Sequence, residues 1–64
     1  MQKYAYLIHD GNQTLKRVET ESFKEALEKF EVFFKRNLTV KYSFAQCAVV
    51  QDRDYVYGIT WMPI

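Results

Sequence analysis

The chain has 64 residues, with nine basic and eight acidic side chains, a net charge of +1 and a single cysteine. A chain this short forms one domain, whose core contributes only about 3–5 kcal/mol, and one cysteine excludes an internal disulfide. The near-neutral charge is the footprint neither of a dedicated duplex-DNA binder nor of an acidic DNA mimic. Residues 1–64 are therefore expected to form one small domain, supported by its 17% of aromatic residues or by self-association.

The apolar segments are short, and strand-forming residues begin almost at Met1. No run approaches the ~18 apolar residues of a membrane-spanning helix, and the early strand leaves no room for a signal peptide. We expect a cytoplasmic protein without a membrane partner.

The first 20 residues predict two strands joined by a tight turn. Residues 3–9 place tyrosine and isoleucine on one face and alanine and leucine on the other, which is typical of an inner strand. The Asp-Gly-Asn sequence at residues 10–12 is a hairpin signal, because glycine and asparagine tolerate a positive φ. Residues 14–20 carry three charged side chains, which suit a strand at the edge of a sheet.

The next segment predicts a helix from Phe23 to Arg36. Ser22 precedes Glu25 by three residues, the spacing of a capping box, in which each side chain bonds a backbone N–H of the first turn. Asn37 is expected in the left-handed position that ends the helix. The apolar side chains form one stripe along this helix: Phe23, Ala26, Leu27, Phe30, Phe33 and Phe34.

The remaining residues predict two more strands. Residues 39–50 are mostly β-favouring and apolar on both faces, and residues 55–62 form the last strand after a polar break. The resulting order, β-β-α-β-β, predicts an α+β fold with a four-stranded antiparallel sheet and one amphipathic helix packed on one face. We expect residues 3–9 and 39–50 to pair in the middle, with the other two strands at the edges.

The two faces of this sheet differ in side-chain size. The face that holds Cys47 and Val49 is made of small residues, and we expect it to lie beneath the helix because four phenylalanines need space. The reverse arrangement, with the large rings beneath the helix and their hydroxyls at the rim, stays open. In the favoured arrangement the exposed face is aromatic and forms a binding surface: Tyr4, Tyr6, Tyr42, Phe44, Tyr55, Tyr57 and Trp61.

Residue types that carry out catalysis are sparse. His9 is the only histidine and stands beside a turn carboxylate, so we expect a surface residue. Cys47 is expected to point inward as inert packing. Only two glycines are present, which leaves no phosphate-cradling loop. We expect no catalytic residue, no cofactor and no metal ligand, and therefore no enzymatic activity.

A large exposed apolar face on a small soluble domain marks a partner surface. The sequence therefore predicts a protein-binding module that is a homodimer or an inhibitor or regulator of another protein. Aromatic rings on an open sheet also suit single-stranded nucleic acid, which is the alternative, although the basic residues are interspersed with acidic ones. In general style the chain resembles the compact accessory proteins encoded by phages and other mobile elements, which often bind and block a host protein.

Overall fold

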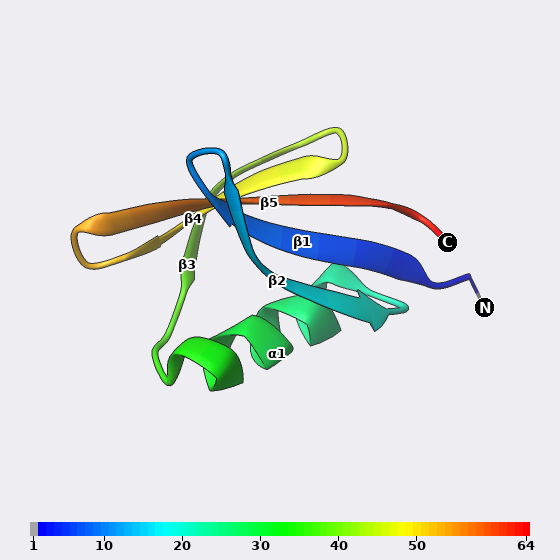
Figure 1. Ribbon diagram of the computed structural model, residues 1–64, viewed down its shortest axis with the longest axis horizontal. Helices are drawn as coiled ribbons and strands as arrows, with labels where there is room; N and C mark the ends of the chain where they lie inside the picture. Colours follow the sequence, from blue (N-terminus) through cyan, green and yellow to red (C-terminus); the bar gives the residue numbers. More distant parts are fainter. Residues whose placement is uncertain (1) are drawn as a thin grey trace.

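The computed structural model describes residues 2–64, and Figure 1 shows one helix beneath a curved antiparallel sheet. The strands lie in the order β2-β1-β5-β4-β3. The α+β class and the helix on an antiparallel sheet are confirmed, whereas the prediction of four strands is wrong. The elements follow in chain order: β1 (Tyr4–Asp10), β2 (Gln13–Thr20), α1 (Phe23–Phe34), β3 (Thr39–Phe44), β4 (Cys47–Asp52) and β5 (Tyr55–Pro63).

The fifth strand arises because residues 39–50 fold back on themselves. Ala45 and Gln46 form a two-residue turn between β3 and β4, and Ala45 has a φ of 53°. A positive φ at such a turn is normally taken by glycine or asparagine, so the Ala-Gln pair carried no turn signal. The predicted strand order is wrong for the same reason, because β5, rather than residues 39–50, pairs with β1.

Replacing Ala45 with glycine is expected to stabilise the fold by about 0.5 kcal/mol. The left-handed region costs an alanine roughly 1–2 kcal/mol, and the gain is partly offset by the larger unfolded-state entropy of glycine. Urea unfolding checks this, with Gln46→Gly as the matched control, since Gln46 has no positive φ to relieve. A lower unfolding midpoint for Ala45→Gly than for the natural protein would contradict the expectation.

The helix begins where the capping box predicts. The Ser22 hydroxyl accepts a hydrogen bond from the Glu25 backbone N–H at 3.2 Å. The end differs from the prediction, because Lys35 rather than Asn37 takes the left-handed cap, with φ 59°. The Arg36 N–H then donates to the Glu31 carbonyl at 3.1 Å, which closes the last turn. Among the described residues no helix is long and apolar enough to cross a membrane.

The core lies between α1 and the sheet face that carries the large rings. Tyr6 packs against both Phe23 and Trp61, with ring centroids 6.2 and 5.4 Å away. Burial, with smaller effects of nearby Tyr4 and Glu25, raises the pKa of the Tyr6 phenol. Four large side chains are fully buried: Phe30, Ile8, Ile59 and Val50.

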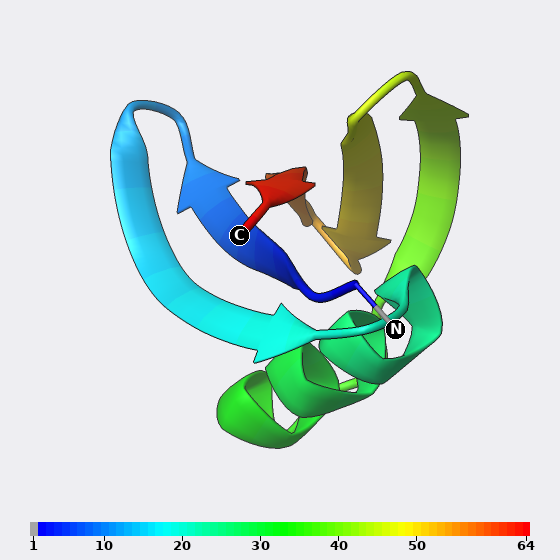
Figure 2. The ribbon, with the colours of Figure 1, turned by 90° about the vertical axis from the view of Figure 1, so that its right-hand side faces the viewer.

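The prediction that the small-residue face lies beneath the helix is therefore wrong. Figure 2 shows a curved sheet with α1 along one part of its underside, and α1 lies closest to β2 and β1. Space remains beneath the other strands, and large rings fill it, as where Phe34 stacks on Tyr57 at 5.1 Å. Phe33, one of the four rings assumed to need that space, is instead 47% exposed, with the Lys16 ammonium over it.

Candidate binding surface

The seven aromatic residues predicted to share one open face do not lie together. Four of them belong to the core or pack against it: Tyr4, Tyr6, Tyr57 and Trp61. Three are strongly exposed: Tyr42, Phe44 and Tyr55. Tyr55 pairs with Asp52 on the side of the sheet that faces α1. Only Tyr42 and Phe44 of the predicted set therefore share the face that the helix leaves uncovered.

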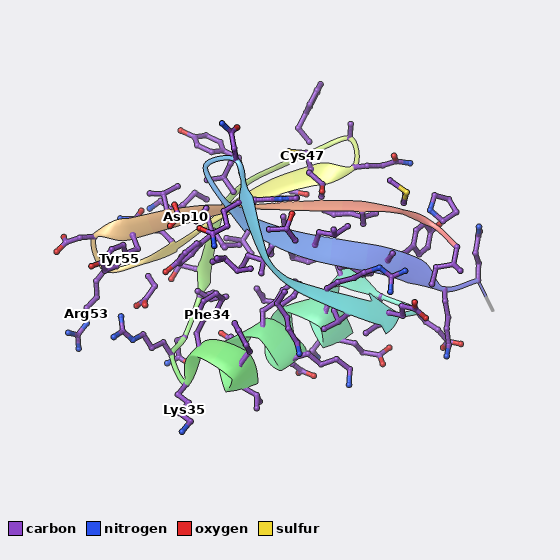
Figure 3. All side chains as sticks on the ribbon, in the orientation of Figure 1. Asp10, Phe34, Lys35, Cys47, Arg53 and Tyr55 are labelled. Carbon is purple, nitrogen blue, oxygen red and sulfur yellow. The ribbon has the colours of Figure 1, made fainter. Side chains whose placement is uncertain are left out.

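The turn after β3 places these two rings on the uncovered face. Because the loop has only two residues, Phe44 pairs with Cys47 and Tyr42 pairs with Val49. The alternate residues of β4 are buried towards α1, so Cys47 and Val49 point away from it. Figure 3 shows Cys47 on the far side of the sheet from the helix. Cys47 is exposed, and the prediction of an inward, packed thiol is wrong.

A bulge in β3 lets the strand change faces along its length. The register shifts at Lys41, so that Val40 pairs with Val50 on the helix side while Tyr42 pairs with Val49 on the other. If side chains are assumed to alternate strictly between the two faces along β3, the residues on one side of Lys41 are assigned to the wrong face. The only warning in the sequence is length, since twelve residues exceed the usual five or six of a strand.

We call the sheet face opposite α1 the open face. The register across the strands defines its central members: Leu7, Tyr42, Phe44, Cys47, Val49, Val56, Gly58, Thr60 and Met62. Phe44 is 82% exposed and Tyr42 72%, and Met62 and Val56 are also more than half exposed. No other element of the described chain covers these side chains. The open face is thus a largely apolar surface with exposed large side chains on β3 and β5.

Short side chains occupy the middle of the open face. Gly58 on the central strand β5 lies between Val49 and His9 in the register, and Thr60 follows two residues later. A Cβ atom added at Gly58 would meet no other heavy atom within 4 Å. The β3 edge of the open face, which we call the β3 rim, therefore carries large rings. The centre holds only the short side chains of Gly58, Thr60 and Cys47.

His9 is held in place at the β2 side of the open face. Its Nε2 lies 2.8 Å from the Thr60 hydroxyl and its Nδ1 lies 3.1 Å from the Thr14 hydroxyl. Both ring nitrogens are engaged, so the imidazole serves here to link three strands. In residues 2–64 no group of three or more His, Cys, Asp or Glu side chains could hold a metal ion.

The open face carries little charge. Arg17 on β2 forms an ion pair with Glu19 two residues later on the same strand. Both side chains lie at the β2 edge, and the β3 rim is at the opposite edge of the sheet. Between these edges the members of the open face are apolar or carry only a hydroxyl or thiol, apart from His9 and Gln51.

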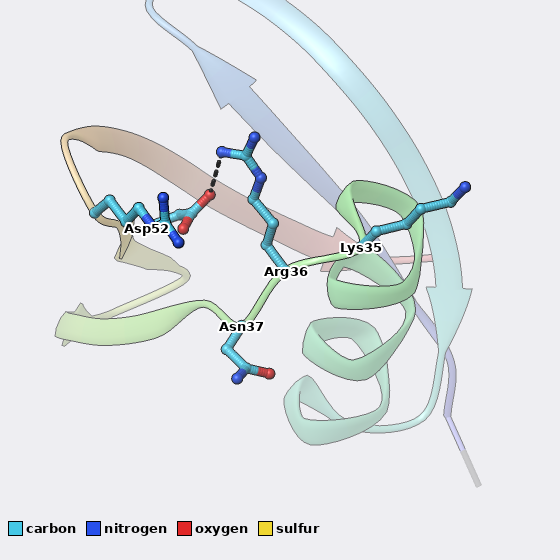
Figure 4. A pocket seen from close by; sticks show the side chains of 5 residues that line it. Lys35, Arg36, Asn37 and Asp52 are labelled. Carbon is cyan, nitrogen blue, oxygen red and sulfur yellow. Dashed lines mark hydrogen bonds and ion pairs between the residues drawn. The ribbon is translucent and has the colours of Figure 1, made fainter.

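A separate, polar cleft of about 440 Å³ lies where the helix ends (Figure 4). Arg36 Nη1 donates to Asp52 Oδ2 at 3.1 Å, and the Asp52 side chain is only 8% exposed. This hydrogen bond raises the pKa of the Arg36 guanidinium. Lys35 and Arg53 add positive charge to the cleft, but the nearby helix carbonyls weaken the attraction for an anion. The ion pair between exposed Arg36 and buried Asp52 ties the segment after α1 to the end of β4.

Sequence prediction missed the role of Asp52, which it assigned to a polar break between strands. The buried carboxylate closes β4 and is matched by Arg36, sixteen residues earlier in the chain. A contact between residues so far apart in the sequence leaves no short motif by which it could be predicted. Comparison of the chain with models of protein families, with curated proteins and with solved structures gave no match, so the open face has to be interpreted from its own chemistry.

Proposed function

We propose that this protein is a small, non-enzymatic binding module and that the open face is the surface that binds another protein chain. The observation that carries the proposal is the exposure of Phe44 and Tyr42, 82% and 72%, on the same face as two exposed aliphatic side chains of β5. Large rings contribute most to protein interfaces, and truncating one typically weakens binding by about 2 kcal/mol or more. Such a module acts by occupying a surface, as an inhibitor or regulator or by joining two copies.

The charge of the open face favours a protein over single-stranded nucleic acid. Binding of a nucleic acid draws most of its affinity from cations that contact phosphates. Arg17 on this face is paired with Glu19 and lies at the edge remote from the exposed rings. Lys16 points to the helix side, where its ammonium lies over Phe33. On β3 itself, Lys41 is the one cation beside the two rings, and a single cation is a weak basis for a stacking platform.

The free edge of β3 is a poorer docking surface than the open face. All six residues of β3 are exposed, and an unpaired strand can in principle accept another strand. The bulge at Lys41 interrupts the regular spacing of backbone groups, and a lysine at that point adds a charge that disfavours pairing. We therefore expect the partner to contact side chains of the face rather than to extend the sheet.

A photo-crosslinking amino acid at position 44 tests this proposal. Produced in cells and irradiated, the Phe44 variant is expected to give a discrete adduct with a protein chain. The matched control carries the same group at Val32, which is 76% exposed on the outer side of α1. Adducts of equal yield at both positions, or none at position 44, would contradict the proposal. An adduct removed by nuclease would favour the nucleic-acid alternative.

A further inference from the structure

We propose that the polar cleft beside the end of α1, separate from the open face, is a second binding site that takes a phosphate group on Arg36 and Arg53. The cleft, of about 440 Å³, is lined by five polar residues: Lys35, Arg36, Asn37, Asp52 and Arg53. Three of these are cations and one is a carboxylate, so the lining carries a net charge of +2. A phosphate group carries nearly two negative charges at neutral pH and has several acceptor oxygens, which matches this lining.

Arg36 is oriented in the cleft by a buried partner. Its Nη1 donates at 3.1 Å to Oδ2 of Asp52, whose side chain is only 8% exposed, and Figure 4 shows Arg36 extended towards that carboxylate. A guanidinium has five N–H donors, and the bond to Asp52 is the one that this side chain makes to the described residues. The Arg36 side chain is 55% exposed, so its other donors are open to the two parallel hydrogen bonds that a phosphate accepts.

Arg53 comes from a different part of the chain, the turn between β4 and β5. Its backbone carbonyl accepts a hydrogen bond from Gln51 Nε2 at 2.7 Å, which holds the turn. Two of the three non-glycine residues with a positive φ in the described chain line this cleft, Lys35 at 59° and Arg53 at 54°. Glycine or asparagine is usual at such positions, so the chain keeps cations where an uncharged residue would be less strained. Figure 3 shows both residues at the same end of the molecule.

The end of α1 opposes an anion only in part. A helix C-terminus carries about half a negative charge, against the net +2 of the lining. Two of the last carbonyls, those of Glu31 and Val32, already accept hydrogen bonds from the Lys35 backbone N–H. The Glu31 carboxylate accepts a hydrogen bond from the Leu38 backbone N–H at 2.9 Å and does not line the cleft. The balance of charge therefore favours an anion.

NMR titration of the ¹⁵N-labelled protein tests this proposal with three probes: inorganic phosphate, glucose 6-phosphate and glucose. Ionic strength is held constant, because exposed charges are screened by salt. The two phosphates are expected to shift the amide signals of residues 35–37 and 53 with dissociation constants on the order of 0.1–1 mM, and glucose is expected to shift none. Tighter binding of glucose 6-phosphate would support a phosphorylated compound as the ligand, and equal binding would support free phosphate.

Two variants assign the binding to the arginines. Arg53→Gly removes a guanidinium and suits the positive φ, so the protein should stay folded while both dissociation constants rise about tenfold. Arg36→Lys keeps a charge beside Asp52 but loses the planar fork, and it should weaken binding about fivefold.

Lys24→Gln is the matched control, because it also removes one exposed cation but lies at the start of α1, and it should change binding less than twofold. Cleft signals that do not shift at about 10 mM of either phosphate would overturn the proposal. So would a loss of affinity in Lys24→Gln equal to that in Arg53→Gly, since binding would then follow net charge alone.

Discussion

Phe30→Ala is expected to leave most of the chain unfolded at 25 °C. Phe30 lies at the middle of α1, is 0% exposed and belongs to the main core cluster. Replacing a buried phenylalanine with alanine lowers stability by about 3–5 kcal/mol, because apolar contacts are lost and a cavity is left. A domain of this length has about the same amount of stability in total. Circular dichroism and urea unfolding measure the loss of structure directly.

Val32→Ala is the matched control for Phe30→Ala, two residues further along the same helix. Val32 is 76% exposed on the outer side of α1, so its truncation should change stability by no more than about 0.5 kcal/mol. A Phe30→Ala protein that melts at the same temperature as the natural one would show that α1 buries a different face.

Trp61→Ala is expected to lower the free energy of unfolding by roughly 2–4 kcal/mol, since the ring is partly rather than fully buried. The sequence pattern assigned this tryptophan to an exposed binding face, where truncation would weaken association. In the structure its ring packs against Phe23 and Tyr6, each at 5.4 Å between centroids. The loss is therefore expected in stability, and urea unfolding of the variant and the natural protein measures it.

Phe44→Ala provides the contrast, because that side chain is 82% exposed. Its truncation should change the stability of the monomer by less than about 0.5 kcal/mol while it weakens association. The opposite pattern, a Trp61→Ala monomer of full stability with reduced association, would place Trp61 at the interface and contradict the packing of the core.

Local sequence signals predicted the features that depend on neighbouring residues. The start of α1 at Phe23 follows from the bond between Ser22 and Glu25, which are three residues apart. The first hairpin turn follows from Gly11, whose φ of 61° few other residues adopt. The buried side of α1 follows from a spacing of four residues, and Ala26 and Phe30 are indeed fully buried. In each case the interaction that decides the structure joins residues only a few positions apart in the sequence.

The presence of an uncovered apolar face was predicted, but not the residues that make it up. Two apolar sheet faces and one helix already implied one uncovered apolar face, because a single helix covers only one side. Which residues lie there depended on Ala45, whose positive φ no sequence rule favours, and on the bulge at Lys41. Of the predicted residues, only Tyr42 and Phe44 reach that face.

The pattern of residues thus determined the helix, the first hairpin and the existence of an uncovered apolar face, since these depend on short-range geometry and on the total apolar content. Tertiary structure decided which face that is. A sheet of alternating side chains has two apolar sides, and the choice between them rests on contacts between distant segments, such as Tyr6 with Trp61 and Phe34 with Tyr57. Large rings fill the space between α1 and the curved sheet. The small residues and the exposed rings of β3 are left on the opposite face.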